Sequence, residues 1–151
     1  MKRRYILVLT VLLLGMGYGQ GLYYEGLKHL MELGNERYKQ DQFLTEKGYE
    51  FVTVEKKEGT QIFKYRGRWN NYYKAELIYD EKIKKLMVVE IGSQVLLEDT
   101  WNKQLKELGF EFMSDYTIGG AYGVIFRKDG YLLTQEKNNS NLKIKIEKKD
   151  F

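Results

Sequence analysis

The spacing of apolar residues predicts two short helices, or one kinked helix, near the start of the chain. Apolar positions recur at helical intervals from Tyr23 to Met31. Gly34 interrupts this pattern, and the helical segment that follows ends at Gly48. Glycine is common just past the end of a helix, so both positions read as boundaries.

After Gly48 the period of the pattern changes to two, which indicates strands. Four strands are predicted in the segments YEFVTVE, TQIFKYR, NNYYKAELIYD and LMVVEI. The connections between them are short, so we expect an antiparallel meander.

A second helix-then-strands pattern begins at Ser93, whose side chain suits a helix N-cap. An apolar stripe runs from Leu97 to Leu108 at intervals of three and four, and Gly109 closes the helix. Strands are then predicted in FEFMSDYT and on both sides of Asp129, where Asp-Gly is a strong hairpin signal.

The last predicted strand is LKIKIE, in which Leu142, Ile144 and Ile146 point inward. Lys143 and Lys145 then point outward. Outward lysines discourage pairing with another molecule, so we expect this strand to lie at an edge of the sheet.

The two helix-to-strand junctions read almost alike, KGYEF and LGFEF, and Gly109 follows Gly48 by 61 positions. We therefore expect an α+β fold: an antiparallel sheet of about seven to eight strands with helices packed on one face. Two helix-then-strand-meander halves, at about 22–91 and 92–151, would build it. The alternative is coincidence, because glycine commonly ends a helix before a strand.

Residues 1–19 are typical of a signal peptide. Three cations at positions 2–4 precede an apolar run at 5–14 that is too short to span a bilayer, and small residues follow. We expect cleavage near Gly19, a single domain over 20–151, and a periplasmic or secreted protein. An uncleaved anchor and a buried N-terminal helix are the alternatives. Membrane contact would then come only through the signal peptide before cleavage.

Charge and composition exclude several function classes. The chain carries a net charge of +4, but Lys2, Arg3 and Arg4 belong to the predicted export signal. We therefore expect no nucleic-acid partner, which requires a basic patch on the folded domain. No cysteine is present, so disulfides and thiol chemistry are impossible.

Catalytic and metal-binding patterns are missing from the sequence. His29 is the only histidine, no cluster of zinc ligands is present, and no serine occupies a nucleophile elbow. We expect no metal, no cofactor and no enzymatic activity. Glu50, Glu76 and Glu111 are the carboxylates that a cell-wall hydrolase would use, but their alternating strand positions favour a solvated face.

Aromatic and arginine residues are concentrated in the stretch KYRGRWNNYY, and a related stretch, SDYTIGGAYG, follows in the second half. Tryptophan, tyrosine and arginine dominate the binding energy of protein interfaces. Since the chain has 13 tyrosines, part of this clustering reflects composition. The candidate binding residues are Tyr65, Arg66, Arg68, Trp69, Tyr72, Asp115 and Tyr116.

The segments LTEKGYEF and LKELGFEF, each followed by a strand meander, resemble those of β-lactamase-inhibitor-like and PepSY-like repeat proteins. The resemblance lies in the architecture and implies a non-catalytic module whose curved sheet presents loops to a partner. The inhibitor carries disulfides and this chain has no cysteine, so no individual inhibitory residue is transferred.

The sequence thus predicts an exported, inhibitor- or immunity-like module that binds another exported or envelope protein. The alternative is a small envelope protein that binds a peptide, glycan or lipid. A cell-wall hydrolase is a third and weaker reading.

Overall fold

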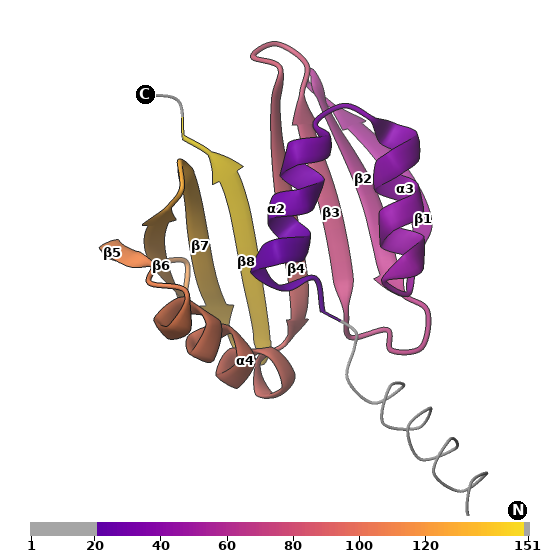
Figure 1. The fold of residues 1–151 in the computed structure, drawn as a ribbon. Coiled ribbons are helices and arrows are strands. Elements are labelled where there is room, and N and C mark those ends of the chain that lie inside the picture. The colour runs from indigo at the N-terminus through magenta and orange to yellow at the C-terminus, as the bar shows by residue number, and fades with distance from the viewer. Residues whose placement is uncertain (1–20, 150–151) are drawn as a thin grey trace, which may run out of the picture.

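The computed structural model describes residues 21–149, so the predicted signal peptide lies outside the described residues. Within them it contains three helices and one antiparallel sheet of eight strands, which confirms the α+β class (Figure 1). The elements of the first part are α2 (Tyr23–Leu33), α3 (Arg37–Glu46), β1 (Tyr49–Lys57), β2 (Thr60–Gly67), β3 (Lys74–Asp80) and β4 (Lys85–Ser93). Those of the second part are α4 (Gln94–Glu107), β5 (Glu111–Ile118), β6 (Ala121–Lys128), β7 (Tyr131–Asn138) and β8 (Asn141–Lys148).

The strands follow the order β1-β2-β3-β4-β8-β7-β6-β5 across the sheet. Each run of four strands is an antiparallel meander, as predicted, and the two runs meet where β4 pairs with β8. Strands β1 and β5 are therefore the edges.

The prediction that the last strand lies at an edge is wrong, because β8 lies between β4 and β7. Lys143 and Lys145 do point away from the buried Leu142, Ile144 and Ile146. Alternation along a strand reports which side of the sheet a residue occupies, whereas the lateral neighbours depend on pairing across the whole chain.

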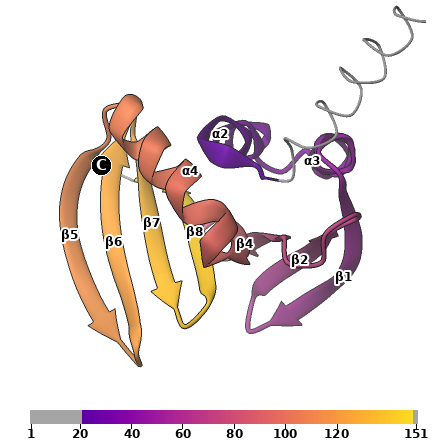
Figure 2. The same cartoon turned by 90° about the horizontal axis from the view of Figure 1, so that it is seen from below.

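The helices contact different parts of the sheet. Helix α3 packs on β1, whereas α2 and α4 both contact the central strands β4 and β8. Figure 2 shows α2 lying between α4 and α3 along the sheet. That all three helices share one face stays a prediction.

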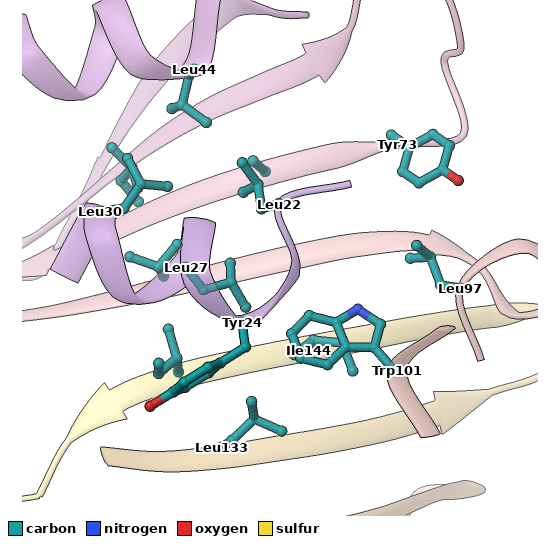
Figure 3. Close-up of a cluster of buried hydrophobic side chains, with 14 of the residues drawn as sticks. Leu22, Tyr24, Leu27, Leu30, Leu44, Tyr73, Leu97, Trp101, Leu133 and Ile144 are labelled. Atoms are coloured by element: carbon teal, nitrogen blue, oxygen red, sulfur yellow. The ribbon is translucent and has the colours of Figure 1, made fainter. Parts of the chain in front are cut away.

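A continuous apolar core joins the helices to the central strands. Leu27 of α2, Trp101 of α4 and Ile144 of β8 are fully buried together in this cluster (Figure 3). In β3, Ala75 and Leu77 are buried, as the predicted alternation requires. Each large side chain buried in this way contributes roughly 1.5–3 kcal/mol, so the core carries the fold without disulfides.

The glycines at the two helix-to-strand junctions terminate their helices as predicted. Gly48 has φ 83° and Gly109 has φ 68°, a left-handed conformation that favours glycine. After α4, the N–H of Gly109 donates to the carbonyl of Lys106, and that of Phe110 donates to the carbonyl of Leu105. This pair of hydrogen bonds is the pattern of a Schellman motif.

The two edge hairpins contain matching ion pairs. Arg66 Nε lies 2.6 Å from Glu50 Oε1 between β2 and β1, and Arg127 Nη2 lies 2.6 Å from Glu111 Oε2 between β6 and β5. Both members of the second pair follow their counterparts in the first by 61 positions, the interval that separates the two glycines.

Matching aromatic contacts and irregularities accompany these ion pairs. Phe51 meets Tyr65 edge-on, and Phe112 meets Phe126 in the same way at the same interval. A β-bulge follows Phe51 in β1 and Phe112 in β5. These contacts agree with two related halves, and the duplication itself stays a prediction.

Candidate functional site

The connection between β2 and β3, residues 68–73, is a hydrogen-bonded loop that we call the aromatic loop. The N–H of Gly67 donates to the carbonyl of Tyr73 at 2.8 Å, which closes the loop at its base. The N–H of Arg68 donates to the carbonyl of Gly48, also at 2.8 Å. Inside the loop, Asn70 Oδ1 accepts the N–H of Tyr72 at 3.0 Å. Hydrogen bonds of the backbone N–H groups therefore hold the loop in a defined shape.

Two large aromatic side chains project from this loop into solvent. Trp69 is 76% exposed and Tyr72 is 72% exposed, while Tyr73 is buried and anchors the loop to the core. The guanidinium of the exposed Arg68 lies 5.7 Å from the centre of the Trp69 ring. The loop thus joins two exposed aromatic faces and one cation on a small area.

Two neighbouring candidates on β2 have structural partners instead. Tyr65 is buried, and its hydroxyl donates to Asp41 Oδ1 at 2.5 Å. Burial is the main cause that raises the pKa of the Tyr65 hydroxyl, and the bond to Asp41 adds to it. Arg66 is held by Glu50 on β1. Tyr65 is therefore not available at the surface, whereas Arg66 is exposed but paired with the neighbouring strand.

The candidates of the second half lie at the other edge of the sheet. Asp115 accepts the hydroxyl of Tyr122 at 3.2 Å, and Tyr116 donates its hydroxyl to Glu136 at 3.0 Å. Six strand spacings separate β2 from β5, or about 29 Å along the sheet. The predicted set therefore divides, and Arg68, Trp69 and Tyr72 are its exposed members on the aromatic loop.

The candidate carboxylates are also separated. Glu50 and Glu111 lie on opposite edge strands, seven spacings or about 34 Å apart along the sheet. A glycosidase pair requires roughly 5–10 Å. Glu76 lies on β3 beside Lys64 of β2. This arrangement does not bring Glu50 and Glu111 together in one site.

The most buried carboxylate, Glu90 of β4, was not singled out by the sequence. It is 0% exposed, and its Oε1 accepts the N–H of Leu22 at 2.6 Å and the hydroxyl of Tyr49 at 3.1 Å. Its Oε2 and the indole Nε1 of Trp101 are buried and complete no hydrogen bond within residues 21–149. A signal was available: Glu90 follows Leu86 and Val88 on the inward side of an apolar strand.

Burial has a clear electrostatic consequence for Glu90. Loss of solvent raises the pKa of its carboxyl, and the hydrogen bonds from Leu22 and Tyr49 offset only part of that rise. Glu90 in turn helps to raise the pKa of the Tyr49 hydroxyl, although burial is the larger cause. Burial therefore shifts Glu90 toward its protonated, neutral form compared with a carboxyl in water.

A second feature missed by the sequence is a groove at the end of the sheet opposite the aromatic loop. Two adjoining cavities of about 220 and 250 Å³ share Gly34, Asn35 and Leu86 in their walls. Residues of the connection between α2 and α3 and of the turn between β3 and β4 line them. Both of these segments lie at the top of Figure 1. We call them together the cationic groove, because Arg37, Lys84, Lys85 and Lys148 are among the residues that line them.

The described residues contain no further candidate site at the histidine, for a metal ion or for a membrane. His29 is exposed on α2 and stacks near Phe43, with ring centres 4.7 Å apart. In the part of the chain that the structure describes, no three histidine, aspartate or glutamate side chains are grouped so as to hold a metal. No helix among residues 21–149 is long and apolar enough to cross a membrane.

Comparison with known proteins adds no identification. No protein-family model, curated protein or solved structure matches this chain.

Proposed function

We propose that this chain is an exported, non-catalytic module that binds another protein through the aromatic loop. The observation that carries the proposal is the exposure of Trp69 and Tyr72, at 76% and 72%, on a loop fixed by backbone hydrogen bonds. Large exposed aromatics supply apolar area to an interface, and a fixed loop loses little entropy when it binds.

The composition of the loop also supports a protein partner. Arg68 lies beside Trp69, and tryptophan, tyrosine and arginine are the residues in which interface energy concentrates. A loop of one tryptophan, one tyrosine and one arginine suits the centre of a small interface. The task that we propose for this module is inhibition of its partner or immunity to it.

Export is the second part of the proposal. The cations at positions 2–4, the apolar run at 5–14 and the small residues that follow support it. The partner is then another exported or envelope protein, in the periplasm or outside the cell. Mass spectrometry of the N-terminus of the protein from native cells tests this part, and an intact Met1 would contradict it.

The docking proposal is tested by comparing captured partners. The tagged full chain is cross-linked in its native cells, and a parallel sample carries Trp69→Ala with Tyr72→Ala. Wild type should retain a specific partner, and purified partner should bind the double variant at least about tenfold more weakly. An equal affinity for both would overturn the proposal.

A matched control separates this loop from other exposed aromatics. Tyr38 on α3 is 81% exposed and lies outside the aromatic loop. Tyr38→Ala should leave capture and affinity unchanged. Loss of binding in this control would mean that exposed aromatic area, rather than the loop, is responsible.

A second candidate function is the binding of a small envelope ligand such as a peptide, glycan or lipid. The cationic groove is the specific observation that favours this function. Small molecules bind in concave sites with apolar walls, and the groove has an apolar floor.

A further inference from the structure

The cationic groove combines three kinds of side chain on separate elements. Its floor is apolar and consists of Phe63 of β2, Leu77 of β3 and Leu86 of β4. Its wall is the connection between α2 and α3. Gln40 Nε2 donates to the carbonyl of Gly34 at 2.6 Å and holds this wall in place.

Cations line both cavities of the groove. Arg37 belongs to the first cavity, and Lys84, Lys85 and Lys148 belong to the second. No aspartate or glutamate of the described chain is among the residues that line either cavity. The local charge therefore favours an anion.

Two of these cations are already paired with carboxylates of the protein. Arg37 Nη2 lies 2.9 Å from Asp41 Oδ1, and Lys85 Nζ lies 3.5 Å from Glu147 Oε2. The other guanidinium nitrogen of Arg37, Nη1, is buried and has no hydrogen-bond partner in residues 21–149. The central guanidinium carbon of Arg37, Cζ, lies 3.9 Å from the centre of the Phe63 ring. The guanidinium therefore stacks on a residue of the apolar floor.

Amide side chains supply a third chemistry. Asn35 donates its amide nitrogen to the Tyr79 hydroxyl at 3.1 Å, and Gln61 donates its own to Glu81. Gln40 donates to Gly34, as described above. Each of these amides also carries an oxygen, which can accept a hydrogen bond from an N–H donor of a ligand.

We propose that the cationic groove binds the carboxyl terminus of a short peptide whose last side chain is apolar. The terminal carboxylate meets the cations, the backbone N–H groups donate to the amide oxygens, and the last side chain covers the floor. The two cavities, of about 220 and 250 Å³, are small and suit the end of a short peptide. A fatty acid has the carboxylate and the apolar body but lacks the N–H donors.

The test is a titration of the isotope-labelled protein with acetyl-Ala-Ala-Leu, followed by backbone amide chemical shifts. The free acid should shift amides of residues 31–37, 61–63 and 84–86. The same peptide with a C-terminal amide should bind at least about tenfold more weakly, because the charge-assisted bonds are lost. Equal affinity of acid and amide, or no shift in these segments, would overturn the proposal.

Charge-removing variants check the assignment without disturbing the core. Lys84 and Lys148 are exposed, so Lys84→Gln with Lys148→Gln should fold normally and weaken the free acid about tenfold. Lys103 and Lys106 are also exposed, but they lie on α4, which contributes no residue to the groove. Lys103→Gln with Lys106→Gln should bind as wild type does, and equal losses in both pairs would contradict a specific site.

Two further arms separate the ligand class and the two sites. Decanoate tests the fatty-acid occupant: if it shifts the same amides at lower concentration than the peptide does, the peptide assignment is wrong. The Trp69→Ala, Tyr72→Ala variant should bind the peptide normally, because the aromatic loop lies at the opposite end of the sheet. Failure of protein docking and failure of peptide binding are thus independent results.

Discussion

At the scale of single residues, Glu90 shows how one buried carboxyl links distant segments. Its Oε1 receives hydrogen bonds from Leu22, just before α2, and from Tyr49 at the start of β1. The N–H of Tyr24 is accepted nearby by Gln104 of α4. These bonds hold the start of α2 against the centre of the sheet. Since Glu90 accepts two of these bonds, the free energy of unfolding depends on its protonation.

The first prediction concerns pH. The folded state raises the pKa of Glu90 above its ordinary value of 4.5, so the folded protein holds this proton to higher pH than the unfolded chain. The contribution of Glu90 to stability is then fully present below about pH 4.5 and declines as pH rises toward the folded pKa. Urea unfolding of wild type and Glu90→Gln at pH values above and below 4.5 measures this.

Glutamine keeps an oxygen for Leu22 and Tyr49 but does not titrate. The stability of wild type relative to Glu90→Gln should therefore fall with rising pH. A constant difference across the series would mean that Glu90 titrates normally in the fold. Glu98→Gln is the reverse control, because Lys137 and Gln94 lower the pKa of Glu98 and its contribution is lost as pH falls.

At the scale of elements, the helix-to-strand junctions determine where the chain changes period. Gly109 ends α4 in a left-handed conformation, and a methyl group placed there would meet no atom within 4 Å. A substitution at this position therefore tests backbone strain alone, without a clash.

We predict that Gly109→Ala lowers the free energy of unfolding by about 1 kcal/mol, because an alanine disfavours positive φ. Gly109→Asn should cost less, since asparagine tolerates this conformation. Thermal or urea unfolding of the three proteins gives the order glycine, asparagine, alanine. An alanine variant as stable as wild type would remove the argument from φ.

The edge strands explain why the repeated motif is structural. Phe51 and Phe112 follow the two glycines by three positions and are 53% and 59% exposed, whereas Tyr49 is fully buried. Each exposed ring packs edge-on against the neighbouring strand just before a bulge. Bulges and charged pairs at both edges hinder strand addition from another molecule, so these elements protect the sheet.

At the scale of the whole molecule, the pairing of β4 with β8 joins the two meanders. Val88 and Ile146 face each other across this pair, as do Glu90 and Ile144, and Trp101 of α4 belongs to the same buried cluster. Since one core spans both meanders, we expect the chain to unfold in a single step.

The corresponding prediction is that Ile144→Ala destabilises the whole molecule by roughly 2–5 kcal/mol through the cavity it creates. Trp69→Phe leaves Trp101 as the only tryptophan, because the chain has two. In that background, Trp101 fluorescence and far-ultraviolet circular dichroism should report the same unfolding midpoint. Ile144→Ala should lower the midpoint of both signals by the same amount. Val95→Ala on α4, where Val95 is 88% exposed, should change it little, and two separate midpoints would contradict a single domain.

Local features of this protein are readable from its sequence. Both junction glycines, the eight strands, the Asp129-Gly130 hairpin and the buried faces of β3 and β8 follow from periodicity and turn chemistry, which act between residues close in the chain. The exposure of Trp69 and Tyr72 follows in the same way, because the glycine and asparagines around them indicate a loop.

Only the tertiary structure decided which distant segments meet. It placed β8 at the centre of the sheet, buried Tyr65 against Asp41 and separated Asp115 and Tyr116 from the aromatic loop. It also assembled the cationic groove from six helices and strands and the turns between them. The physical reason is range: periodicity assigns a side chain to a face, whereas pairing across the sheet depends on burying one core shared by both halves.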